Sequence, residues 1–188
     1  MQIETNRFQK EVKKHGSDSF PLLISYERLS EYESGAFMWH WHPEIEITYV
    51  QTGHMHYQVN HNSYRLKAGD FLFANANVLH KGMMENMADC EYISLTFHPK
   101  LIYGFSQSEI FKKYVEPVIH NLAMPAVHID FSMPWHKKYS ELVYRIIALS
   151  KEQPPFFELD ISGLLQSLWR LLLANALPEE ESKPCDVA

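Results

Sequence analysis

The periodicity of the apolar side chains changes once along the chain, near Pro99, and this change sets the fold class. Before Pro99, short runs rich in β-branched and aromatic residues alternate with turn-forming residues, which is the pattern of antiparallel strands. The runs cover residues 22–29, 44–51, 54–60, 63–66, 71–74 and 91–97. After Pro99 the apolar residues recur at helical spacing. The sequence therefore predicts a mainly β part, closed into a sandwich or small barrel, followed by helices.

Two long helices are predicted in the second part, over residues 134–151 and 158–177, and each has an apolar stripe along one face. The second helix also carries leucines outside its stripe. A helix that is apolar over so much of its circumference needs partners on more than one side, either within the chain or in a second subunit. The candidates for a dimer interface are Leu165, Leu168, Leu171, Leu172 and Leu173.

Length and composition limit the possible functions. A chain of 188 residues with 46% hydrophobic residues can bury the core of one compact domain. No apolar run approaches the ~20 residues of a membrane span, and the N-terminus is polar, so we expect a cytoplasmic protein without a membrane partner. Cys90 and Cys185 are too far apart in the sequence to suggest a disulfide or a thiolate zinc site. A net charge of -6 argues against DNA binding by this chain itself.

The stretch FMWHWHPEIEITYVQTG, residues 37–53, contains the strongest candidate for a binding site. In a strand, His40, His42 and Glu46 point to the same face, so they are either the solvated side of that strand or a set of metal ligands. A carboxylate four residues beyond His42 would lie about 13 Å away along a straight strand, too far to share an ion. Because Pro43 interrupts a strand ladder, we expect the histidines to end one strand and Glu46 to begin the next.

A metal site needs a third imidazole, and His80 is placed to supply it, shortly after the turn-forming Asn75 and Asn77. The solvated-face alternative stays open, because the chain has 11 histidines and a second alternating pair, His54 and His56.

These residues resemble the two motifs of the cupins. The first motif, a glycine followed by H-x-H-x3-E-x6-G, is matched by Gly35, His40, His42, Glu46 and Gly53. The second, G-D-x4-P-x-G-x2-H, is matched in part by Gly69, Asp70 and His80. Gly35 lies one residue nearer the histidine than usual, and Asn75 and Asn77 replace the proline and the glycine. Asparagine tolerates the left-handed conformation, so the turn remains feasible at Asn77.

The remainder of the chain resembles, more narrowly, the N-terminal sensor half of AraC-type transcription regulators. The segments KHGSDSFPL, SLTFHPKLIYG and KYVEPVI and the two amphipathic helices extend this likeness over nearly the whole chain. It implies a cupin barrel, that is, a jelly roll or double-stranded β-helix, followed by an α-helical pair. We expect the barrel with an N-terminal arm at 1–99 and a helical appendage forming a dimer interface at 100–177. Residues 178–188 are expected to form a linker to a C-terminal DNA-binding domain that is absent from this chain.

The resemblance implies a ligand-sensing and dimerisation domain that binds a small effector, such as a sugar, inside the barrel. The expected effector-binding residues are His40, His42, Glu46, Thr48, Tyr57 and His80. One divalent ion, Zn, Ni, Mn or Fe, is expected at His40, His42, Glu46 and His80 if a metal is bound. The alternative is a metal-dependent cupin enzyme, an oxygenase or isomerase, which the same ligands would serve. The helical appendage and linker favour the sensor, which would contact DNA only through the missing domain.

Overall fold

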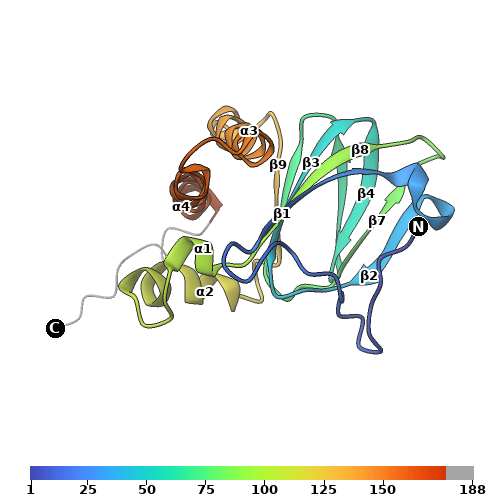
Figure 1. The fold of residues 1–188 in the computed structure, drawn as a ribbon. Coiled ribbons are helices and arrows are strands. Elements are labelled where there is room, and N and C mark those ends of the chain that lie inside the picture. Colours follow the sequence, from blue (N-terminus) through green and yellow to red (C-terminus); the bar gives the residue numbers. More distant parts are fainter. Residues whose placement is uncertain (177–188) are drawn as a thin grey trace. The chain divides into compact units, whose positions relative to one another are not determined.

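Two antiparallel sheets form the barrel of the first structural unit, Met1–Pro99 and Asn121–Phe131 (Figure 1). The structure, a computed structural model, describes residues 1–176. In spatial order, the first sheet contains β1 (Leu22–Arg28), β8 (Glu91–Phe97), β3 (Ile45–Thr52), β6 (Phe71–Ala74) and β9 (Ala126–Ile129). The second sheet contains β2 (Ala36–His40), β7 (His80–Met84), β4 (His54–Val59) and β5 (Asn62–Lys67). Two 3-10 turns, η1 (Leu29–Glu31) and η2 (Glu33–Gly35), precede β2.

Alternation along the strands places the core between the two sheets. In β4, Met55, Tyr57 and Val59 are buried, whereas His54 and His56 are half-buried on the other face. His54 Nε2 lies 3.5 Å from a carboxylate oxygen of Glu85. This second pair of histidines is therefore the outward face of a strand. The core cluster draws on both sheets and contains Leu29, Tyr32, Phe37, Val50, Met55, Tyr57, Val59, Leu66, Leu72, Ala74, Cys90 and Tyr92.

The turn between β3 and β4 requires a glycine. Gly53 has a φ of 75°, in the left-handed region, and a Cβ added there would lie 2.2 Å from the carbonyl oxygen of Asp89. Both the backbone conformation and the close approach of a neighbouring chain segment therefore exclude a side chain.

The six predicted strands are confirmed as β1, β3, β4, β5, β6 and β8, and the sequence analysis missed β7 and β9. β9 pairs with β6, so residues 121–131 belong to the barrel unit although they lie within the range 100–177, for which only helices were expected. The backbone N–H of Asn75 donates to the carbonyl of Pro125 at 2.9 Å, immediately before this pairing begins. The strand conformation of β9 depends on its pairing with β6 rather than on a local pattern.

The second unit is helical, and its described part comprises residues 100–120 and 132–176. It contains α1 (Lys100–Tyr103), a π-helical turn η3 (Phe111–Val115), α2 (Glu116–Ile119), α3 (His136–Glu152) and α4 (Phe157–Ala176). The two predicted long helices are thereby confirmed as α3 and α4. The predicted linker, 178–188, lies outside the described residues.

The polar side chains of α4 hold the short helices of this unit. Ser162 donates to the carbonyl of Leu101 at 2.9 Å, Gln166 to that of Ile102 at 3.0 Å, and Trp169 to that of Tyr114 at 2.9 Å. A helix as short as α1 or η3 leaves most of its carbonyl groups without a donor inside the helix, and these bonds supply the donors. α4 also packs against α3.

The predicted dimer residues of α4 divide into two groups. Leu165, Leu168 and Leu172 are buried within the chain, so they have no free surface to offer a second subunit. Leu171 and Leu173 are half-buried. Dimerisation therefore stays a prediction, and it depends on Leu171 and Leu173 rather than on all five leucines.

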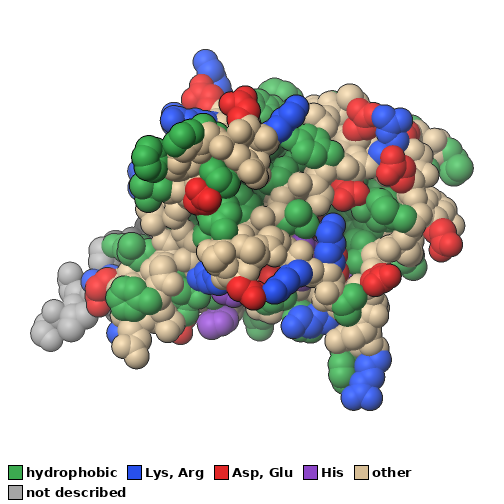
Figure 2. All heavy atoms as spheres, viewed as in Figure 1, with side chains coloured by type: hydrophobic (Ala, Val, Ile, Leu, Met, Phe, Trp, Pro, Cys, Tyr) green, Lys and Arg blue, Asp and Glu red, His purple; other side chains and the backbone are tan. Residues whose placement is uncertain are grey.

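Over the described residues, no helix combines the length and the hydropathy needed to cross a bilayer. On the face drawn in Figure 2, Lys and Arg side chains are interspersed with Asp and Glu. That face offers no continuous basic patch of the kind that binds a phosphate backbone.

Candidate metal and ligand site

Strand pairing brings His40 and His80 together from distant parts of the sequence. β2 ends at His40, β7 begins at His80, and the two residues are paired across the sheet. Pro43 lies between the end of β2 and the start of β3, as predicted, so the chain turns there. The backbone N–H of Asn77 donates to the carbonyl of His42 at 2.9 Å and ties His42 to the loop before β7. Three histidines thus meet at one end of the barrel strands.

The imidazole rings of His40, His42 and His80 form a buried cluster. The ring centroids of His40 and His80 are 4.2 Å apart, and those of His42 and His80 are 5.0 Å apart. One nitrogen from each ring lies within 4.8 Å of the other two. The three residues are at most 3% exposed. This spacing is compatible with three ligands around one ion.

Backbone carbonyls orient all three rings. Each Nδ1 lies 2.9 to 3.2 Å from a carbonyl oxygen, that of Met38 for His40, Glu44 for His42 and Val78 for His80. A carbonyl can only accept, so Nδ1 carries the proton and Nε2 keeps the lone pair. The Nε2 atoms of His42 and His80 are buried and have no hydrogen-bond partner. Metal-binding imidazoles are held in the same way, with one nitrogen bonded to the protein and the other free for the ion.

Glu46 lies beside this cluster, with its Oε2 3.6 Å from Nε2 of His42. Its Oε1 accepts hydrogen bonds from the hydroxyls of Tyr57 at 2.9 Å and Thr48 at 3.0 Å. Burial alone would raise the pKa of Glu46, but the interactions of its carboxylate with the neighbouring His42, His80 and His40 outweigh burial and hold that pKa well below its usual value. Glu46 is therefore an ionised carboxylate.

Burial disfavours the charged form of two histidines of the cluster, His40 and His80. Burial is the main cause that lowers the pKa of His40 and holds the pKa of His80 well below its ordinary value. A neutral imidazole has the free lone pair that a metal ion requires. Three imidazoles and one carboxylate form a donor set that fits Zn, Ni, Mn or Fe as a divalent ion.

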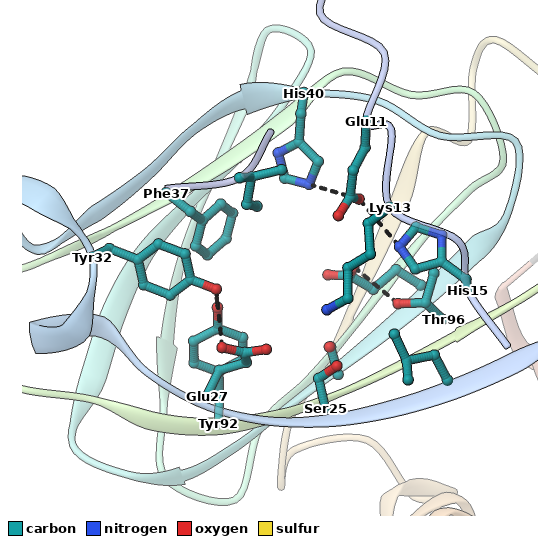
Figure 3. A pocket seen from close by; sticks show the side chains of 14 residues that line it. Glu11, Lys13, His15, Ser25, Glu27, Tyr32, Phe37, His40, Tyr92 and Thr96 are labelled. Carbon is teal, nitrogen blue, oxygen red and sulfur yellow. Dashed lines mark hydrogen bonds and ion pairs between the residues drawn. The ribbon is translucent and has the colours of Figure 1, made fainter. Parts of the chain in front are cut away.

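A cavity of about 50 Å³ borders His40 and Glu46 within the barrel unit (Figure 3). Part of its wall comes from neighbouring strands, since Ser25 of β1 pairs with Ser94 of β8 and Glu27 pairs with Tyr92. The cavity is therefore polar on that side, with hydroxyl groups and one carboxylate available to a ligand.

The N-terminal arm, residues 1–21, forms another part of the wall. The N–H of Trp41 donates to the carbonyl of Gln9 at 3.0 Å, and the N–H of Glu11 donates to the carbonyl of Trp41 at 2.9 Å. These two bonds set the side chains of Glu11, Lys13 and His15 against the cavity. Figure 3 shows Glu11 directed at His40 and His15.

His15 joins the arm to the barrel through two carboxylates. Its Nε2 lies 3.2 Å from Glu11, and its Nδ1 lies 3.2 Å from Glu44. Burial alone would lower the pKa of His15, but the hydrogen bonds and charges of Glu11 and Glu44 raise it to about 9. His15, His42 and Glu44 also lie close enough together to hold an ion. An imidazolium cannot ligate a metal, so we interpret this second group as an ion pair.

The structure brings the four predicted metal ligands together, although Glu46 lies outside the group of three mutually close histidines. Of the predicted effector-binding residues, His40 and Glu46 border the cavity, whereas Thr48 and Tyr57 hydrogen-bond to Glu46. The sequence analysis missed the polar cavity residues Glu11, Lys13, His15, Ser25, Glu27, Tyr32, Tyr92, Ser94 and Thr96. The alternation of Ser25 with Glu27, and of Ser94 with Thr96, is a signal that could have found four of them.

The barrel, the histidine motif and the following helices define a cupin-type domain with a helical appendage. The chain matches the family model of the AraC-like ligand binding domain over residues 28–185. Because this match covers most of the chain, the chain belongs to that family. The predicted resemblance to AraC-type regulators and the predicted cupin fold are confirmed.

Relatives of the chain include a regulator and several barrel proteins. The Uncharacterized HTH-type transcriptional regulator YdeC of Bacillus subtilis (strain 168) is 26% identical over 171 residues, which are 91% of this chain and 58% of that protein. The chain thus spans just over half the length of this relative. A predicted oxalate decarboxylase from Thermotoga maritima is 23% identical, with a TM-score of 0.37, over 40% of this chain and 65% of that one. A Cupin 2 conserved barrel domain protein from Salinispora arenicola is 17% identical, with a TM-score of 0.37, over 41% and 63%.

Proposed function

We propose that this chain is the effector-sensing part of an AraC-type transcription regulator, and that its barrel binds a small molecule beside a divalent metal ion. Family membership supports the sensing role. The similarity to an HTH-type regulator, of which the chain spans 58%, supports a DNA-binding domain elsewhere in the whole protein. The net charge of -6 agrees with leaving DNA contacts to another domain.

One observation carries the metal proposal. Two buried imidazole nitrogens, Nε2 of His42 and Nε2 of His80, lack any hydrogen-bond partner. A buried polar atom left without a partner costs free energy, so such atoms need an explanation. A metal ion held by His40, His42, His80 and Glu46 would satisfy both nitrogens at once, and it would supply a Lewis acid to which an oxygen of the effector could bind.

Metal analysis of protein purified without a histidine tag tests this proposal. We expect up to one divalent ion per chain in the unmodified protein, and we expect its loss in His80→Gln and in His40→Gln. His61→Gln is the matched control, because His61 is exposed and is not part of the cluster. Thermal unfolding of each variant separates loss of the ion from loss of the fold. Metal retained in both folded cluster variants would contradict the proposal.

The second candidate is a metal-dependent cupin enzyme, an oxygenase or isomerase. It is favoured by the same cluster, because three imidazoles and a carboxylate beside a cavity leave room for a substrate. Family membership favours the sensor. Turnover assays of the metal-loaded chain, compared with its His80→Gln variant, distinguish the two, since a sensor binds its ligand and releases it unchanged.

The proposal includes a homodimer formed through α4. Leu171 and Leu173 are half-buried and flank the buried stripe of the helix, so a second copy of the helix could cover both. A sugar is one candidate class of effector. The charged side chains around the cavity favour a charged effector instead.

A further inference from the structure

We propose that the arm segment Glu11–Lys13 is a built-in occupant of the cavity, and that the effector displacing it is a small zwitterion with a carboxylate and an ammonium group, as in a free amino acid. This inference rests on the proposed sensing function, since it names the ligand class of that same cavity. The charged groups that the arm places against the barrel support this inference.

The carboxylate of Glu11 occupies the position that we propose for the effector's carboxylate. Its Oε2 lies 3.2 Å from Nε2 of His15 and 4.0 Å from Nε2 of His40, and the side chain is 7% exposed. A buried carboxylate is costly unless it is paired with a cation or hydrogen-bonded. Glu11 therefore marks a position in the cavity, beside Nε2 of His15, that accepts a carboxylate.

The ammonium group of Lys13 occupies the position that we propose for the effector's ammonium group. Lys13 follows Glu11 by two residues and lines the same cavity, into which its ammonium points in Figure 3. Its charge acts on Glu27, a half-buried carboxylate that also accepts a hydrogen bond of 3.0 Å from the Tyr32 hydroxyl. Burial raises the pKa of Glu27, so its ionised form gains from a nearby cation. Glu27 therefore marks the cation end of the cavity.

The groups that remain after the segment Glu11–Lys13 leaves match a zwitterion better than the alternatives. Glu27 stays at one part of the cavity, and His15 stays at another, held through its Nδ1 by Glu44 at 3.2 Å, with its Nε2 free to bind a carboxylate. A neutral sugar would leave Glu27 without a positive partner, and a simple carboxylic acid would do the same. A ligand with both charges restores the pairing that Glu11 and Lys13 provide.

The arm is attached in a way that permits exchange. Two backbone hydrogen bonds join it to Trp41, and Trp41 Nε1 donates to the carbonyl of Phe8 at 2.9 Å. The side chains of Phe8 and Val12 are 65% and 59% exposed, so the arm buries little apolar surface at these positions. Segments with few buried apolar contacts open at low free-energy cost.

Calorimetric titration of the metal-loaded chain with each standard L-amino acid, added singly, tests the ligand class. We expect at least one of them to bind. The matching 2-hydroxy acid, which lacks the ammonium group, and the matching amide, which lacks the carboxylate, should each bind at least ~10-fold more weakly, since losing one charged pair corresponds to roughly this factor.

Variants of the arm test whether it competes. Glu11→Gln and Lys13→Met should each strengthen amino-acid binding several-fold, because each removes part of the internal occupant. Glu4→Gln and Lys14→Met are the matched controls and should leave the affinity unchanged. Glu4 is exposed and absent from the cavity, and Lys14 pairs with Asp18 on the surface.

Hydrogen exchange reports the arm directly. Ligand binding should accelerate exchange at the amide of Glu11, which donates to the carbonyl of Trp41, and at the amide of Trp41, which donates to the carbonyl of Gln9. A neutral sugar that binds while these amides stay protected would overturn the inference. So would the absence of amino-acid binding to both the unmodified chain and the Glu11→Gln/Lys13→Met double variant. Amino-acid binding that persists without metal would count against the metal site alone, and metal binding without amino-acid binding would count against this inference alone.

Discussion

The backbone N–H of Asn77 donates a hydrogen bond of 2.9 Å to the carbonyl of His42, and Asn77 has a φ of 61°. This left-handed residue occupies the position at which the cupin motif has a glycine. It links the loop before His80 to the segment that carries His42. The loop and two of the three clustered histidines therefore depend on one backbone conformation.

Substitution of Asn77 should separate conformation from side-chain chemistry. Asn77→Gly should leave the free energy of unfolding nearly unchanged, because glycine adopts this conformation without strain. Asn77→Ala should lower it by about 1 kcal/mol, because alanine lacks the short polar side chain that makes the left-handed conformation tolerable for asparagine. Urea unfolding of the three proteins measures both effects. Equal stability of Asn77→Ala and the unmodified chain would show that the loop does not need this conformation.

Tyr57→Phe should destabilise the protein through Glu46. The Tyr57 hydroxyl donates to Glu46 at 2.9 Å, and both groups are buried. Losing a hydrogen bond to a charged group typically costs about 1.5 to 3 kcal/mol. Tyr26→Phe is the control, because Tyr26 is 57% exposed, and it should change the free energy of unfolding little. If the two variants unfold at the same urea concentration, Tyr57 does not support the carboxylate.

The Glu27→Gln variant should gain stability relative to the unmodified chain as the pH rises from acid to neutral. Burial is the main cause that raises the pKa of Glu27 in the folded state above its ordinary value of 4.5. The folded state therefore loses stability as the pH rises through the folded pKa, where Glu27 ionises. Glutamine has no such ionisation, and its side-chain oxygen can still accept from Tyr32.

Urea unfolding at several pH values between acid and neutral measures this difference. The two proteins should have similar stability below pH 4.5, and the glutamine variant should gain with increasing pH. A difference that is constant over this range would show that the ionisation of Glu27 is not coupled to folding.

Replacing Leu171 and Leu173 together by lysine should weaken a dimer of this chain. Both residues are half-buried on α4, and burying each side chain contributes about 1.5 to 3 kcal/mol relative to exposure. Ala174→Lys is the control, because Ala174 is exposed on the same helix. Light scattering over a range of concentrations measures the mass. An unmodified chain that stays monomeric at high concentration would contradict the predicted assembly.

Local patterns in the sequence determine most of the secondary structure and the metal-ligand candidates. Alternation and β-branched or aromatic residues predict six strands, β1, β3, β4, β5, β6 and β8. Helical spacing of the apolar residues predicts α3 and α4. His40, His42 and Glu46 are recognisable because their spacing and Pro43 set their geometry within a few residues. His80 is recognisable only through its motif, because its approach to His40 depends on the pairing of β2 with β7.

Tertiary structure alone decides what surrounds this cluster. The arm has no periodicity, so nothing local predicts that Glu11 lies against His40 or that Lys13 lines the cavity. β9 lies within a range whose pattern is helical and is a strand because β6 offers it a pairing edge. The polar cavity wall arises from the register of β1 with β8, strands far apart in the sequence. Each of these features depends on contacts between distant segments, whose free energy is realised only when the whole barrel closes, and a local pattern cannot encode them.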